Sequence, residues 1–61
     1  MNDRDERELS LIRQGLSPQE ADVLASIEAG ERGVDIAARL GVTRQAVTDA
    51  KRRAIIKASE Q

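Results

Sequence analysis

Cysteine, histidine and aromatic residues are all absent from this chain of 61 residues. Without cysteine there is neither a disulfide nor a thiolate metal site, and without histidine only carboxylates remain as metal ligands. The carboxylates and serines that are present are scattered and form no nucleophile–base arrangement. No glycine-rich phosphate loop follows a strand, because no strand pattern occurs. We therefore expect neither an enzyme nor a protein that binds a metal, cofactor or small molecule.

The lack of aromatic side chains also restricts the core, which Leu, Ile, Val and Ala must fill. A chain of this length buries only about 60% of the surface that it exposes when unfolded. Close-packed short helices or association with a second copy are the usual remedies. No apolar run approaches the roughly 18 residues that cross a bilayer. The mixed-charge N-terminus lacks the apolar segment of a secretory signal, and we expect a cytoplasmic protein away from membranes.

The charges are divided unevenly between the two halves of the chain, although the net charge is only −1. Residues 1–31 carry three arginines against eight carboxylates, which gives −5. Residues 32–61 carry seven cations against three carboxylates, which gives +4. A chain polarised in this way presents a basic face to phosphates and an acidic face to solvent.

Apolar spacing and capping residues predict four helices, the first over residues 3–14 and ended by Gly15. Leu9, Ile12 and Leu16 recur at three- and four-residue steps, which places them on one side. The second helix begins after Ser17, which with Glu20 forms a capping box, and it runs to about residue 29. Pro18 suits its first position because the missing N–H has no helical partner there. Its expected inward residues are Ala21, Leu24 and Ile27, with Val23 at the flank.

The third helix is predicted over residues 33–40, and the fourth from about 43 to 57 or 58. Ala37, Gly41 and Val47 have the spacing of a steep joint between two helices. Such a joint, in which two short helices cross at a steep angle, needs a small residue in the first helix so that the second can approach closely. It also needs a turn residue that tolerates positive φ and a branched apolar residue in the second helix that fills the contact. Thr43 is a good N-cap for the fourth helix. The expected core residues here are Ile36, Leu40, Val42, Ala46, Ala50 and Ala54. The sequence thus predicts an all-α domain with a tri-helical helix-turn-helix core.

A helix-turn-helix places the outward face of its second helix in the major groove of DNA. Arg44 is suited to guanine O6 and N7, and Gln45 to adenine N6 and N7. Thr48 and Arg52 lie one and two turns further along the same face and complete the expected base-reading set. The expected phosphate contacts are Thr43, Lys51, Arg53, Arg32 and Arg39. Taken alone, the basic run 51–53 is also compatible with a solvated helix end.

Asp49 lies on the same face and has three interpretations. It accepts a hydrogen bond from cytosine N4, it orients Arg52 or Arg53, or its negative charge disfavours binding to non-cognate DNA sequences. Ile55 and Ile56 are adjacent, so both cannot enter one small core. We expect Ile56 to be exposed and to contact a second copy, with Leu11 as a further dimer contact.

The run from Leu16 to Leu24 reads L-S-P-Q-E-A-D-V-L and resembles the opening of the LuxR/GerE-type DNA-binding domain, L-T-P-R-E-x-E-V-L. The match continues through Gly30, Ile36, Ala37, Leu40, Val42, Thr43 and Val47, over about two-thirds of the chain. The second half is equally similar to sigma-factor region 4, with Gly41–Val47 against G-V-S-R-E-x-V and Arg53, Ala54 and Lys57 against R-A-x-x-K. Both resemblances imply a tri-helical DNA-binding core. The further dimerisation helix of the LuxR type is missing, so we expect a standalone domain over residues 16–61. The helix in residues 1–15 is then a replacement dimerisation or partner element.

These observations predict a sequence-specific regulator of transcription that binds double-stranded DNA as a homodimer, most simply as a repressor. The sequence also allows the protein to activate transcription through a contact with RNA polymerase. A protein-interaction module is the alternative function. In that case the domain is an anti-activator or sigma-like accessory that binds polymerase or another regulator through its acidic first helix.

Overall fold

The computed structural model describes residues 2–60, which form four helices and contain no strand. The helices are α1 (Asp3–Arg13), α2 (Pro18–Glu28), α3 (Gly33–Leu40) and α4 (Arg44–Ser59). The predicted all-α class with four helices is confirmed, and the predicted helix ends differ from these bounds by one or two residues. No helix in residues 2–60 has the length and apolar character needed to cross a membrane.

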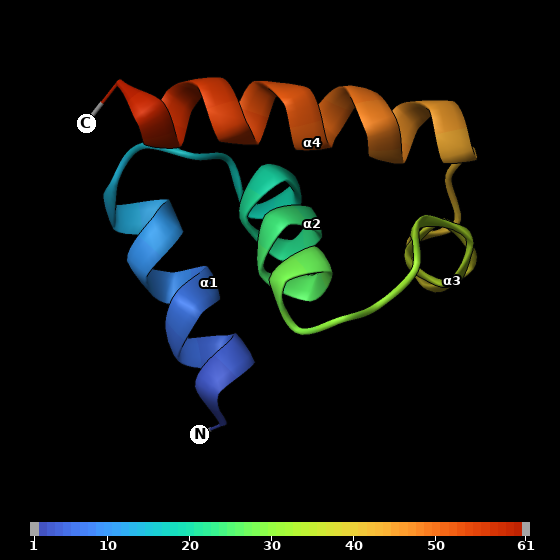
Figure 1. The fold of residues 1–61 in the computed structure, drawn as a ribbon, viewed down its shortest axis with the longest axis horizontal. Coiled ribbons are helices and arrows are strands. Elements are labelled where there is room, and N and C mark those ends of the chain that lie inside the picture. Colours follow the sequence, from blue (N-terminus) through green and yellow to red (C-terminus); the bar gives the residue numbers. More distant parts are fainter. Residues whose placement is uncertain (1, 61) are drawn as a thin grey trace.

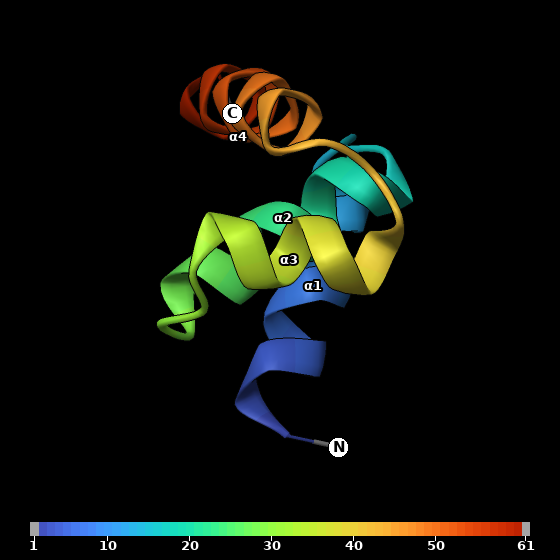
Figure 2. The ribbon, with the colours of Figure 1, turned by 90° about the vertical axis from the view of Figure 1, so that its right-hand side faces the viewer.

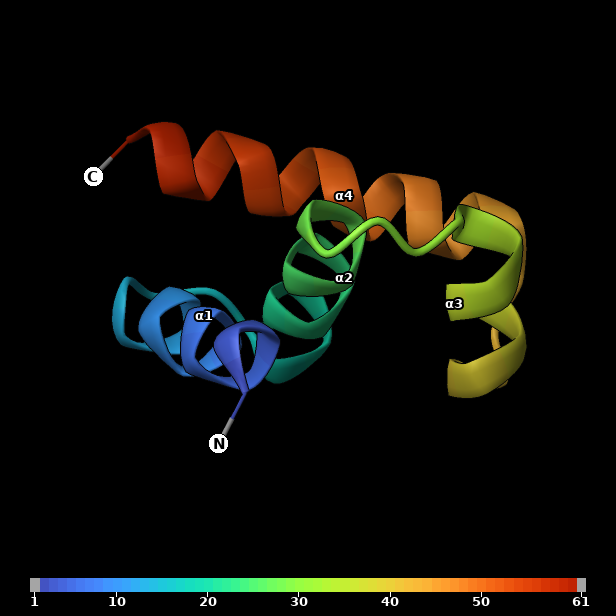
Figure 3. The same ribbon diagram turned by 60° about the horizontal axis from the view of Figure 1, so that its bottom comes forward.

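The helix α4 lies across one side of the other three helices (Figure 1). It crosses over α2, and α3 lies beneath its N-terminal end (Figures 1 and 2). In the turned view α1 and α3 flank α2 on opposite sides (Figure 3). Within residues 2–60, no other element covers the outer side of α4, so one face of this helix remains exposed.

Local signals explain where α2, α3 and α4 begin and end. The Ser17 hydroxyl accepts from the Glu20 amide at 3.2 Å, and the Glu20 carboxylate accepts from the Ser17 amide at 3.0 Å, which confirms the capping box. Thr43 caps α4 in a similar way, since its hydroxyl oxygen accepts from the Ala46 amide at 3.0 Å. Gly41 ends α3 at φ +71°, in the left-handed region where a side chain is costly. The turn between α3 and α4 therefore has the form that the sequence predicts.

Two apolar clusters form the core, and α2 and α4 contribute to both. Beneath the N-terminal half of α4, Val23, Ile36, Ala37, Val47 and Ala50 pack together, with Ile27, Leu40 and Val42 at the margin. This is the joint predicted from the spacing of Ala37, Gly41 and Val47. Beneath the C-terminal half of α4 lie Leu11, Leu16, Ala21, Leu24, Ala25 and Ala54. The domain therefore has its core on both sides of α2, with α4 spanning the two clusters.

The predicted apolar side of α1 is confirmed for Ile12, which packs against the core cluster that contains Leu16, but it is wrong for Leu9. Leu11 is fully buried at 0% exposure, whereas Leu9, which was expected to face inward, is 41% exposed. Leu11 therefore belongs to the core of one chain and cannot serve as the dimer contact expected from the sequence. The physical reason lies two turns earlier, because Arg4 stands on the same side of α1 as Leu11 and bonds to polar groups of α2.

The polar groups of α2 that Arg4 contacts are centred on Ser26, which is completely buried. Its hydroxyl oxygen accepts from Arg4 Nε at 3.1 Å and from Arg39 Nη2 at 2.8 Å, and the hydroxyl donates to Asp22 Oδ1 at 3.1 Å. Arg4 and Arg39 also pair with Asp22. The Arg39 guanidinium and the Ser26 hydroxyl donate to Asp22 and lower its pKa, against the opposing effect of burial. The network connects α1, α2 and α3, and it sets the phase in which α1 packs.

Candidate nucleic-acid interface

The free face of α4 carries the residues that the sequence predicts to read bases. Arg44, Gln45, Thr48 and Arg52 are all exposed, and Lys51 is exposed beside them. The opposite side of the helix is buried through Val47, Ala50 and Ala54. Because a helix turns 100° per residue, this burial pattern directs the polar set away from the core. The structure thus brings all four predicted base-reading residues onto one accessible surface.

Ion pairing separates the cations into two groups. Carboxylates bind the side chains of Arg4, Arg7, Arg32, Arg39, Arg53 and Lys57. Within residues 2–60, Arg44, Lys51 and Arg52 form no ion pair, and the only other cation of this kind there is Arg13 on α1. An unpaired guanidinium or ammonium keeps its donors available for phosphate or base acceptors. The free positive charge of the domain is therefore concentrated on the outer face of α4.

The N-terminal end of α4 adds hydrogen-bond donors to this surface. Thr43 accepts from Ala46 with its hydroxyl oxygen, which leaves the hydroxyl proton free to donate. The amides of Arg44 and Gln45 belong to the first turn, where no helical carbonyl precedes them. Together with the helix dipole, such donors favour an anionic group. This geometry is compatible with the phosphate contact predicted for Thr43.

Three of the predicted phosphate contacts bind carboxylates of the domain itself. Arg39 donates to Asp22 at 2.9 and 3.2 Å and lies 3.6 Å from Glu31. It acts in the packing of α3 on α2, and we withdraw its predicted phosphate role. Arg53 donates to Glu20 at 3.3 Å and is 59% exposed, so one side of its guanidinium remains accessible. Arg32 pairs only with Asp35 three residues on, with its side chain 79% exposed, and its phosphate role stays a prediction.

Glu20 has a larger role than the cap that the sequence predicts. Its side chain is only 6% exposed and accepts from Lys57 Nζ at 2.8 Å and from Arg53 Nε at 3.3 Å. The hydrogen bond from Lys57 and the one from the Ser17 amide lower the pKa of Glu20 to about 2. These bonds hold the C-terminal half of α4 against the start of α2. Sequence reasoning missed them because Glu20 and Lys57 are 37 positions apart.

We expect Glu20→Gln to destabilise the domain in a way that depends on pH. Glutamine keeps an oxygen for the cap but loses the charge, so the cost at pH 7 is about 2 kcal/mol, as for other charged hydrogen bonds. The folded pKa lies below the ordinary value of about 4.5, so the carboxylate stabilises the fold above pH 5. This stabilisation disappears as the pH falls toward 2. Urea unfolding at several pH values measures it.

Glu28→Gln is the matched control for Glu20→Gln. Glu28 pairs with Arg7 at 2.8 Å, but both side chains are 42% exposed, and an exposed pair contributes about 0–1 kcal/mol. The difference between Glu20→Gln and the unaltered chain should be largest at pH 7 and close to zero near pH 2. An equal difference at both pH values would show that the Glu20 charge does not stabilise the fold.

Gln45 and Asp49 form a hydrogen bond on the free face of α4. Gln45 Nε2 donates to Asp49 Oδ1 at 3.1 Å, one helical turn away. One interpretation of the sequence is that Asp49 orients Arg52 or Arg53. In the structure Asp49 accepts a hydrogen bond from Gln45 instead. Arg53 stands one turn after Asp49 but bonds to Glu20.

The C-terminal half of the same helix is apolar on its outer side. Ile55 is 44% exposed and Ile56 is 57% exposed. The predicted exposure of Ile56 is confirmed. With Leu11 buried, Ile56 is the part of the predicted dimer contact that remains accessible, and the exposed Ile55 adjoins it. The free face of α4 therefore changes from polar and cationic near its start to apolar near its end.

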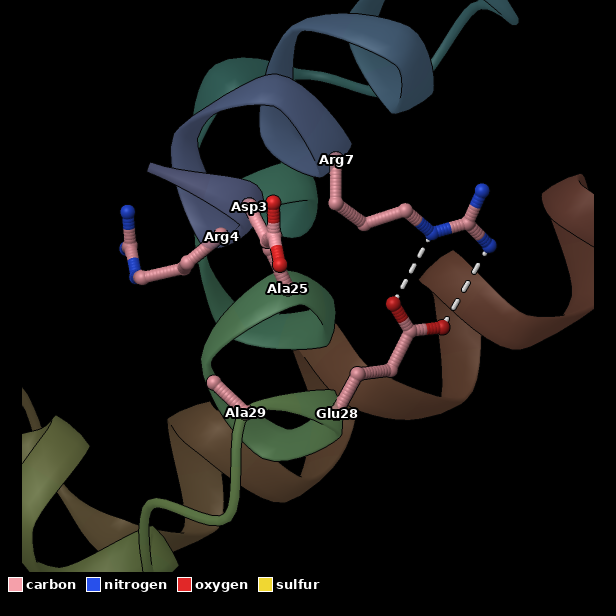
Figure 4. Close-up of a pocket in the computed structure, with 6 residues that line it drawn as sticks. All are labelled: Asp3, Arg4, Arg7, Ala25, Glu28 and Ala29. Atoms are coloured by element: carbon pink, nitrogen blue, oxygen red, sulfur yellow. Dashed lines mark hydrogen bonds and ion pairs between the residues drawn. The ribbon is translucent and has the colours of Figure 1, made fainter. Parts of the chain in front are cut away.

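A small open cleft lies between α1 and α2, away from α4 (Figure 4). It is lined by Asp3, Arg4, Arg7, Ala25, Glu28 and Ala29. Arg7 and Glu28 bond to each other across its rim, and Arg4 extends to the other side (Figure 4). Both arginines are paired with carboxylates, so the cleft offers no free cation to a ligand.

The fold and this surface together define a helical domain with one exposed cationic helix face. No protein-family model, no curated protein and no solved structure matches the chain.

Proposed function

We propose that this protein binds double-stranded DNA in a sequence-specific way and regulates transcription, with α4 in the major groove. The observation that carries the proposal is the placement of the unpaired cations. Arg44, Lys51 and Arg52 lie on the exposed outer face of α4, beside Gln45 and Thr48. The joint of α3 and α4 is the packing that a helix-turn-helix requires. A helix with this surface, held rigidly at both ends, fits the roughly 12 Å width of the groove.

Each residue of the surface has a distinct role in this proposal. Arg44 donates a two-pronged hydrogen bond to guanine, and Gln45 reads adenine. Thr48 contacts a thymine methyl group, and Arg52 reads a base or the backbone further along. Thr43 and Lys51 bind phosphates and fix the register. The accessible side of Arg53 contributes a further phosphate contact near the groove edge.

The acidic carboxylates of α1 and α2 direct the molecule onto DNA. They pair with the cations of α1, α3 and the end of α4, so these surfaces carry little net positive charge. Only the outer face of α4 attracts a polyanion. With about three phosphates neutralised per subunit, the logarithm of the association constant of one subunit should fall with a slope of about −3 against the logarithm of salt concentration, and that of a dimer with about twice this slope.

We further propose that two copies bind together through Ile55 and Ile56. These residues lie roughly 10–17 Å along α4 from Thr48 and Gln45, at 1.5 Å per residue. Two copies that meet at the ends of α4 therefore place their reading residues about 30 Å apart, close to the roughly 34 Å between successive major grooves. Such a dimer recognises an inverted repeat and represses by blocking polymerase. This proposal places the protein with the DNA in the cytoplasm.

Ile56→Glu should abolish this association and leave the monomer folded, because the side chain is 57% exposed. A charge at the centre of a small apolar contact is strongly unfavourable when it is desolvated. We expect a fall in molecular mass by light scattering and at least a tenfold loss of affinity for a two-site duplex, with affinity for a half-site unchanged. Leu9→Glu is the control, since Leu9 is 41% exposed on α1. Equal mass for the two variants and the unaltered chain would rule out a dimer through Ile56.

Selection from a pool of random duplexes, followed by binding measurements at several salt concentrations, tests the proposed function. We expect an enriched motif, tighter binding to it than to random duplex, and the salt slope given above. The interaction module predicts the opposite outcome. In that case no duplex is enriched even at low salt, and the protein forms a stoichiometric complex with polymerase or another regulator.

A further inference from the structure

We infer that Asp49 makes the surface selective for adenine over guanine at the base that Gln45 reads. The inference rests on the proposed DNA binding, which it deepens by naming the preferred base and the residue that enforces it. It follows from the hydrogen bond between Gln45 Nε2 and Asp49 Oδ1 at 3.1 Å.

The chemistry of the two groups fixes the orientation of the Gln45 amide. An ionised carboxylate only accepts hydrogen bonds, so Gln45 must turn its NH₂ group toward Asp49. One N–H is then used by the carboxylate. The amide presents its carbonyl oxygen and one remaining N–H to a ligand.

Adenine and guanine differ in how well they pair with an amide that has one N–H bonded to Asp49 and only one N–H free. Adenine displays one donor, the N6 amino group, and one acceptor, N7, which match the free oxygen and the free N–H of Gln45. Guanine displays two acceptors, O6 and N7, and requires two donors. Asp49 removes one of the two amide donors and places a negative charge near both guanine acceptors. A free glutamine amide has no such restriction and rotates to present its NH₂ group.

The surrounding charges keep Asp49 available for this role. Arg53 is four residues beyond Asp49, at the spacing of a helical ion pair, and would be its natural partner. Glu20 instead accepts from Arg53 Nε at 3.3 Å. Within residues 2–60, Asp49 forms no ion pair, and Gln45 is the side chain that donates to it. The buried carboxylate of Glu20 thus holds one of the two neighbouring cations away from Asp49, and the other, Arg52, forms no ion pair with it in residues 2–60.

The test is a set of affinities for duplexes that differ only by adenine or guanine at one position. That position is first identified as the one where Gln45→Ala abolishes the base preference of the unaltered chain. We expect the unaltered chain to prefer adenine by about tenfold or more, the scale of one good two-pronged contact. Asp49→Asn should reduce this ratio to about threefold or less. Asp49→Glu, which restores a carboxylate within reach of Gln45, should recover most of it.

The ratio of the affinities for the adenine and guanine duplexes separates base selection from the effect of net charge. Removing a carboxylate raises the affinity for all duplexes and leaves a ratio set by net charge alone unchanged. Asp35→Asn removes an equal charge from an exposed residue of α3 and should leave the ratio unchanged. Circular dichroism verifies that each variant is folded. An unchanged ratio in Asp49→Asn overturns this inference and leaves the proposed function intact. Failure of the unaltered chain to select any duplex overturns both.

Discussion

Replacing Leu11 by alanine is expected to destabilise the domain by about 3 kcal/mol. Leu11 is fully buried in the cluster that joins α1, α2 and the end of α4. Leu-to-Ala changes at such sites cost about 2–5 kcal/mol, because apolar contacts are lost and a cavity remains. A domain of this size has a total stability of roughly 3–9 kcal/mol. The variant therefore loses a large part of its stability, and α4 loses its support at one end.

Leu9→Ala is the matched control, because it makes the same substitution on the same helix at a side chain that is 41% exposed. We expect it to change the free energy of unfolding by less than about 1 kcal/mol. Thermal or urea unfolding at several protein concentrations gives both values. A loss in Leu11→Ala that appears only as weaker self-association would show that α1 is a dimerisation arm and not part of the core.

Arg44→Ala is expected to reduce affinity for the selected duplex by about 1–3 kcal/mol, which is roughly five- to 150-fold. Arg44 is exposed, forms no ion pair within residues 2–60, and stands in the first turn of α4. Loss of its two-pronged contact should also relax the preference at one base pair. Lys51→Ala should weaken binding to cognate and random duplexes about equally and lower the salt slope by about one.

Arg13→Ala is the control for both changes. Arg13 is an exposed cation at the end of α1, so its removal alters the net charge by the same amount without touching α4. It should lower affinity for DNA only slightly, by a long-range effect that salt screens. If Arg13→Ala and Arg44→Ala weakened cognate binding equally, net charge and not the α4 surface would account for the affinity.

The features that could be predicted from the sequence are those encoded within a few residues. Ser17, Pro18 and Glu20 define the start of α2, and Gly41 with Thr43 defines the turn before α4, because caps and turns depend on local hydrogen bonds. The same reasoning places the exposed face of α4, since Val47 and its buried neighbours repeat at helical spacing.

The features that could not be predicted depend on contacts between distant segments. The spacing of Leu9 and Ile12 predicts that both face inward, but the structure buries Leu11 beside Ile12 and leaves Leu9 exposed. Arg4 bonds to α2 from the same side of α1 as Leu11. Arg39 has the appearance of a surface cation until α2 provides Asp22 as its partner. In both cases a polar contact between two helices determines whether a side chain faces the core or the solvent. The residues next to it in the sequence do not specify this.

The acidic first half of the chain has a physical role in this account. Its carboxylates neutralise the arginines that pack the helices, among them Arg4 and Arg39, and they restrain Arg53 and Lys57 at the end of α4. The remaining free cations on α4 then form one patch instead of a uniformly basic surface. A net charge of −1 is therefore compatible with DNA binding.

The most direct test of the central claim is a titration of isotopically labelled protein with the selected duplex, followed by amide chemical shifts. The account predicts shifts concentrated from Thr43 to Arg53, with the amides of α1 and of the α1–α2 cleft nearly unchanged. Shifts confined to α1 and α2, or none at saturating DNA, would contradict the assignment of the outer face of α4 as the surface that meets the groove.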